Sequence, residues 1–104
     1  MNINELIYVN PNKEDNCNIN KLNPDWKNIL SNYMSTRYIS YNKYEVHNSY
    51  FIAIDDANDD TIKMLNKANI TIYSMDYIVD TIFIRFKDEK FRDLMFDVLN
   101  KKVV

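Results

Sequence analysis

Four aspartates lie within six consecutive residues, at Asp55, Asp56, Asp59 and Asp60. Clustered carboxylates can ligate Mg²⁺ or Ca²⁺. They can also mimic phosphates and occupy a nucleic-acid-binding groove on another protein. The same residues suit a helix start, because they satisfy free N–H groups and favour the positive end of the helix dipole. The helix start is the simplest interpretation, a protein-binding patch is the functional hypothesis, and we expect no metal.

Tyrosines in or beside predicted strands form a second set of candidate partner-binding residues. The set comprises Tyr38, Tyr41, Tyr44, Tyr50, Tyr73 and Tyr77. Tyrosine packs in cores, but it is also enriched at protein interfaces and stacks on bases. In a single sheet with helices on one face, half of each alternating pattern points away from the helices. Several of these rings are therefore expected on an open face, where they could contact a partner.

The residues needed for most catalytic and cofactor motifs are missing. The chain has no glycine, which excludes a phosphate loop, a dinucleotide fingerprint and a nucleophile elbow. Because the chain has only one histidine, His47, most zinc sites and most histidine-based acid–base mechanisms are excluded. We expect His47 in a turn with Asn48. The only cysteine, Cys17, lies in a polar loop, where we expect it exposed and without a nearby cation to activate it. We therefore expect no catalytic residue and no cofactor, and the chain is predicted not to be an enzyme.

Charge and composition further limit the possible function, cellular compartment and source of the chain. Thirteen basic and fifteen acidic residues give a net charge of −2, whereas dedicated phosphate-backbone binders usually carry a basic excess. One unpaired cysteine, no signal peptide and no apolar stretch of ~20 residues favour the cytoplasm. The abundance of Asn, Ile, Tyr and Lys is typical of an A/T-rich genome, such as a low-GC bacterium, its phage or plasmid, or a large DNA virus. The length predicts one domain over residues 1–104.

Local patterns predict the helices and turns. Asn23 and Pro24 favour a helix start, and an apolar face at spacings of three and four follows, so a helix is predicted over residues 24–34. A second helix should follow the aspartates and end near Asn69, and a third should begin at Asp88. Without glycine, turns that need a positive φ must use Asn or Asp.

Strands are predicted over residues 5–9, 38–46, 50–55, 70–75 and 81–86. In the last of these, Ile82, Ile84 and Phe86 share one face, and Phe83 and Arg85 share the other. The order β-α-β-β-α-β-β-α predicts an α+β fold. Its first six elements match a ferredoxin-like βαββαβ antiparallel sheet with helices on one face, extended by a C-terminal strand and helix. Residues 10–23 form an Asn-rich loop that we expect to be partly mobile.

Two segments resemble the motifs of RNA-recognition domains. ELIYVN at residues 5–10 resembles the first-strand motif, and NSYFIAID at residues 48–55 lies where the second motif would fall. Tyr50 matches one aromatic position of that motif, but Ile52 occupies the other, and its basic residue and glycine are missing. The resemblance implies a shared topology and not a shared function.

These observations favour a small non-catalytic inhibitor or adaptor that binds a protein. A phage or mobile element of a low-GC host is a plausible source, and a host enzyme such as a CRISPR-type defence nuclease a plausible target. Tyrosines would anchor the complex, and aspartates would meet a basic nucleic-acid-binding groove.

Two alternatives remain. In a single-stranded nucleic-acid binder, Tyr8 and Tyr50 would stack on bases, and Lys43, Arg37 or Arg85 would contact phosphate. In the other alternative, the chain is a homo-oligomeric regulatory subunit, for example a homodimer. Its copies would pair through an edge strand or the last helix.

Overall fold

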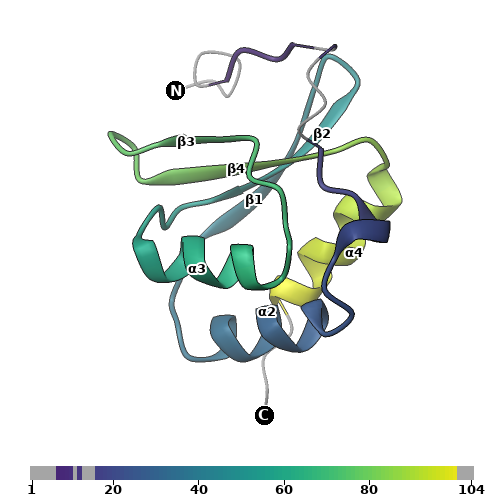
Figure 1. The fold of residues 1–104 in the computed structure, drawn as a ribbon. Coiled ribbons are helices and arrows are strands. Elements are labelled where there is room, and N and C mark those ends of the chain that lie inside the picture. The colour runs from purple at the N-terminus through teal and green to yellow at the C-terminus, as the bar shows by residue number, and fades with distance from the viewer. Residues whose placement is uncertain (1–6, 11, 13–15, 101–104) are drawn as a thin grey trace.

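The computed structural model describes residues 7–10, 12 and 16–100. Within them lie three α-helices, one 3-10 turn and a four-stranded antiparallel sheet (Figure 1). The helical elements are η1 (Ile19–Lys21), α2 (Trp26–Ser35), α3 (Asp59–Lys67) and α4 (Glu89–Asn100). The strands are β1 (Tyr41–Val46), β2 (Ser49–Ile54), β3 (Ser74–Asp76) and β4 (Thr81–Phe86). The predicted α+β class is confirmed.

The strand order is β1-β2-β4-β3, so the predicted ferredoxin order is wrong. The place beside β2 that this order gives to the first strand belongs to β4, which pairs with β2 from Ile82 to Phe86. The reason is burial: every residue of β4 is buried, as suits a strand that is covered on both faces. Residues 7–9, the described part of the first strand predicted over residues 5–9, are not a strand; residues 5 and 6 lie outside the described chain.

A polar side chain that accepts a backbone N–H lies at the start of α3 and α4 and shortly before the start of α2. Asn58 Oδ1 accepts from Thr61 N at 3.0 Å, and Asp88 Oδ1 accepts from Lys90 N at 2.9 Å. Asn23 makes the same contact with the second residue after it, at 2.9 Å, although regular α2 begins later, at Trp26. The three helix starts predicted from the sequence are therefore confirmed to within two residues.

Positive φ angles occur where the glycine-free sequence offers asparagine or aspartate. Asn48 (φ 59°), Asn69 (φ 57°) and Asp80 (φ 51°) follow the prediction that such positions use Asn or Asp. His47 (φ 50°), which precedes Asn48 in the tight β1–β2 turn, is the exception among the described residues. Asn69 ends α3, where Ile70 N donates to Leu65 O at 3.0 Å and closes the helix in a Schellman arrangement.

The main core lies between the sheet and the helices. Ile52, Ile54 and Ile84 face Leu30 and Met95, all of them fully buried. Figure 1 shows α2, α3 and α4 on this one side of the sheet. The C-terminal helix therefore does not cover the opposite face. No helix in the described residues has the length and apolar character needed to cross a bilayer.

Cys17 belongs to this core, so the expectation of an exposed thiol is wrong. Its backbone N–H donates to Arg85 O at 2.8 Å, which draws the Asn-rich segment against the end of β4. Only 5% of its surface remains accessible. Burial raises the pKa of the thiol to about 12, against a smaller lowering by a hydrogen bond with the Thr71 backbone.

The opposite face of the sheet carries a second, smaller core. It contains Val46, Phe51, Ala53, Tyr73 and Phe83. Residues 7–10 cover it: Ile7 is buried there, and the Tyr73 hydroxyl donates to Tyr8 O at 3.0 Å. Figure 1 shows this N-terminal segment across the sheet from the helices. The predicted alternation in residues 81–86 is confirmed, because Phe83 lies on this face and Ile82, Ile84 and Phe86 lie on the other.

Candidate partner-binding surface

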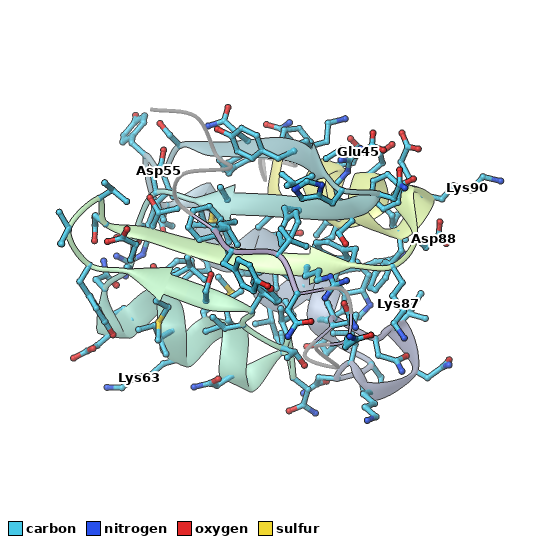
Figure 2. All side chains as sticks on the ribbon, turned by 90° about the horizontal axis from the view of Figure 1, so that it is seen from above. Glu45, Asp55, Lys63, Lys87, Asp88 and Lys90 are labelled. Carbon is cyan, nitrogen blue, oxygen red and sulfur yellow. The ribbon has the colours of Figure 1, made fainter. Side chains whose placement is uncertain are left out.

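One end of the sheet brings together three connections that are distant in sequence. Asp55, in the β2–α3 connection, donates its N–H to Ser40 O in the α2–β1 connection at 2.9 Å. The Thr81 hydroxyl donates to Asp55 Oδ1 at 3.0 Å, and Ala57 N donates to Asp80 Oδ1 at 3.1 Å. These contacts tie the β3–β4 turn to the start of α3. Figure 2 shows Asp55 at this end, opposite Lys87, Asp88 and Lys90.

This surface, the acidic end, collects six aspartates and one arginine from those connections, from the last residue of β3 and from the first turn of α3. They are Asp55, Asp56, Asp59, Asp60, Asp76, Asp80 and Arg37. Their formal charge is −5, although the whole chain carries only −2. Arg37 pairs with Asp60 at 3.7 Å and lies 4.3 Å from the centre of the Tyr33 ring. The acidic end is therefore more negative than the chain as a whole, whose other side chains sum to +3.

The predicted aspartates have two kinds of role. Asp56 accepts from Asn58 Nδ2 at 2.6 Å and from the Thr61 hydroxyl, and Asp55 accepts from Thr81. The helix-start interpretation predicted that these carboxylates accept free N–H groups of the helix, but neither does, because Asn58 is the residue that caps α3. Asp56 instead holds side chains at the start of α3, and Asp55 ties this connection to β4. Asp59 and Asp60 lie in the first helical turn, where the dipole favours them, but their side chains are exposed.

Within the described part of the chain, no group of three or more His, Cys, Asp or Glu side chains is placed to hold a metal ion. Most carboxylates of the acidic end instead have hydrogen-bond or ion-pair partners within the protein.

Three of the six candidate tyrosines lie at the acidic end. Tyr38 is fully exposed, and Tyr77, in the β3–β4 turn, is 66% exposed. Tyr41 lines a hollow of about 650 Å³ beside Tyr38, between the ends of α2 and α4. Its hydroxyl donates to Asn100 Oδ1, and partial burial raises the pKa of this phenol. These rings can contribute contact area next to the aspartates.

The other three tyrosines are directed elsewhere. Tyr73 is buried in the second core, and Tyr44 packs against its edge. Tyr50 lies on the helix side, 5.3 Å from the guanidinium of Arg92. The sequence indicated that these residues belong to strands, but it did not indicate which faces would be covered.

Sequence reasoning missed Asp76, Asp80 and Ile78 of the β3–β4 turn. They lie between the strands predicted over residues 70–75 and 81–86, in a segment to which no site residue except Tyr77 was assigned. The antiparallel pairing of β2 with β4 places this turn next to Asp55, since Ile54 pairs with Ile82. These residues could therefore have been assigned to the site only with knowledge of the strand order, because their residue types alone do not place them beside Asp55.

The side chains expected to bind nucleic acid do not share a surface. Tyr8 is exposed on the N-terminal segment, whereas Tyr50 points toward the helices. Arg85 is buried, and its guanidinium donates to Asn10 O at 2.9 Å and to the Ser49 hydroxyl at 3.0 Å. This arrangement gives no support to base stacking by Tyr8 together with Tyr50.

Comparison with known proteins gives no relative for this chain. No protein-family model, no curated protein and no solved structure matches it.

Proposed function

We propose that this chain is a small non-catalytic inhibitor or adaptor that binds a partner protein through its acidic end. The observation that carries the proposal is the convergence of six aspartates with exposed Tyr38 and Tyr77 on one end of the sheet. Aspartates with different local roles therefore share one negatively charged surface, and the exposed aromatic rings lie beside them. Interfaces are enriched in such rings, and complementary charge provides specificity and a fast association rate.

The partner surface that fits this end is basic. A protein groove that binds nucleic acid presents lysines and arginines spaced to contact phosphates. Carboxylates at the acidic end could pair with those cations, and the bound chain would then exclude nucleic acid from the groove. Inhibition by occlusion needs no catalytic residue in the inhibitor, which agrees with the residue types in the sequence.

The biological setting belongs to the same proposal. The A/T-rich composition supports a phage or mobile element of a low-GC host, and a defence nuclease of the CRISPR type has the required basic groove. The unpaired Cys17, buried as a thiol, supports action in the reducing cytoplasm.

The test is affinity capture from a low-GC bacterial lysate with two charge-matched variants. Asp59→Asn/Asp60→Asn neutralises two exposed carboxylates of the acidic end, and Glu45→Gln/Asp97→Asn neutralises two exposed carboxylates outside it. We expect a stoichiometric protein partner that survives nuclease, is kept by the control and is captured more weakly by the first variant. The association rate with the purified partner should fall as salt rises, and less steeply for the first variant.

Two results would contradict the proposal. A partner captured equally by both variants would show that the acidic end is not the docking surface. Material released by nuclease would move the assignment to the nucleic-acid-binding alternative.

A further inference from the structure

The β3–β4 turn exposes two large apolar side chains side by side in sequence. Ile78 is 96% exposed and Tyr77 is 66% exposed. A single exposed apolar side chain is ordinary, but adjacent exposed apolar side chains rimmed by polar residues are typical of interaction sites. A turn of this kind would normally use polar residues, so the choice of residues needs a reason beyond the turn geometry.

Hydrogen bonds fix the shape of this turn from both sides. Asp76 Oδ1 accepts from Ile78 N at 2.9 Å. The Thr81 hydroxyl lies 2.9 Å from Val79 O and 3.0 Å from Asp55 Oδ1, and its one hydrogen is shared between these two acceptors. Asp80 has a positive φ of 51° and accepts from Ala57 N at 3.1 Å, which ties the turn to the start of α3. The apolar pair is therefore held in a defined position before any partner arrives, and little ordering cost remains on binding.

We propose that this turn is the anchor of the docking surface, and that Ile78 and Tyr77 enter an apolar pocket of a partner protein whose rim carries Lys and Arg side chains. This inference rests on the proposed function and deepens it, because it names the residues that enter the partner and the chemistry of the site that receives them.

Charge selects a protein pocket over the other surfaces that could cover the turn. Asp76 and Asp80 flank the apolar pair, and Asp55 lies beside them through its contact with Thr81. A second copy of this end, a nucleic-acid backbone or an anionic membrane surface would each bring negative charge against these carboxylates. A basic rim around an apolar pocket meets both features of the turn. It also matches the common interface pattern of a desolvated centre inside a polar ring.

The test uses a phage-displayed library of random peptides, selected on the immobilised full chain. Dissociation constants of the enriched peptides are then measured for the wild type and four variants. Ile78→Ser and Tyr77→Ser remove the anchor, and Ile19→Ser is the matched control, because Ile19 is also exposed but lies on η1. Asp59→Asn/Asp60→Asn reports on the acidic end separately. Equal thermal unfolding midpoints are expected for Ile78→Ser and the wild type, because the side chain makes almost no contact with the protein.

We expect enriched peptides to combine a large apolar residue with Lys or Arg. Their affinity should fall about tenfold or more for Ile78→Ser, less for Tyr77→Ser, and not for Ile19→Ser. Peptides that bind Ile78→Ser as tightly as the wild type would overturn the inference, as would a library without any binder that prefers the wild type.

The aspartate variant separates the two levels of failure. If peptides ignore Ile78→Ser but lose affinity for Asp59→Asn/Asp60→Asn, the acidic end binds without this anchor, and the proposed function survives. If neither variant changes affinity, both the anchor and the acidic end are excluded as the binding surface.

Discussion

At the scale of single residues, Cys17 shows how packing controls chemistry. A thiol is nucleophilic only as the thiolate, and the pKa of Cys17 is raised to about 12 by burial in the main core. The side chain therefore acts as a small apolar residue that attaches the Asn-rich segment to the sheet. Because this segment also leads into α2, the thiol helps to set where the first helix packs.

The raised pKa makes a prediction about stability against pH. A group whose pKa is higher in the folded state than in the unfolded state stabilises the fold below the unfolded value, here the ordinary 9.0. That contribution is lost progressively as the pH rises from about 9 toward 12. Cys17→Ala should cost about 1 kcal/mol in urea unfolding near neutral pH, through lost packing. The gap from the wild type should narrow as the pH is raised through about 10. A gap that stays constant would mean that the folded thiol ionises as readily as the unfolded one.

At the scale of elements, local signals in the sequence predicted several individual helices, strands and turns, but they did not predict the order of the strands in the sheet. The helix starts at Asn58 and Asp88, the turn at Asn48, and the strand at residues 81–86 follow from neighbouring residues, and all are present. The strand order depends instead on which apolar segment takes the centre of the sheet. ELIYV at residues 5–9 and TIFIRF at residues 81–86 are both strand-like. No local rule decides between them.

The candidate site also has one part that the sequence predicts and one part that depends on the strand order. The cluster from Asp55 to Asp60 is contiguous in sequence and was visible there. Asp76, Asp80 and Ile78 join it only through the pairing of β2 with β4. The chain in fact builds two similar units, β1-β2-α3 and β3-β4-α4, whose second strands pair at the centre of the sheet. The antiparallel central pair places the turn of the second unit beside the end of β2.

This strand order predicts that the two central strands, β2 and β4, are the last to lose their hydrogen bonds on unfolding. β2 and β4 are each paired on both edges, and β4 is buried along its whole length, whereas β1 and β3 are edge strands. Amide hydrogens of β4 and β2 should therefore exchange only through global unfolding, and those of β3 through smaller local openings. Hydrogen exchange monitored by NMR gives the comparison. Had β4 been an added strand at the margin of a ferredoxin-like sheet, its amides would exchange as an edge strand does, and that result would contradict the order described above.

At the scale of the whole molecule, the sheet is covered differently on its two faces. Three helices cover one face, but in the described residues a short segment at positions 7–10 covers the second core. Ile7 supplies its apolar contact, with 4% of its surface accessible. Hydrogen bonds from the Tyr73 hydroxyl to Tyr8 O and from Arg85 to Asn10 O hold the segment in place. Among the described residues, the cover of this second face therefore includes Ile7 and Val9 and these hydrogen bonds.

We therefore predict that Ile7→Asp uncovers Phe51 and Phe83 without unfolding the helical side. A charge at a buried apolar position is unfavourable by several kcal/mol, more than a short segment can offset, so the segment should detach. Fluorescence of the dye ANS should rise while the far-ultraviolet circular dichroism of the helices persists. Tyr8→Asp is the control: its side chain is 86% exposed, and dye binding should stay at the wild-type level. If Ile7→Asp and the milder Ile7→Ser both unfold the whole chain, the segment is an integral part of the core. If neither binds the dye, the second face does not depend on Ile7 for its cover.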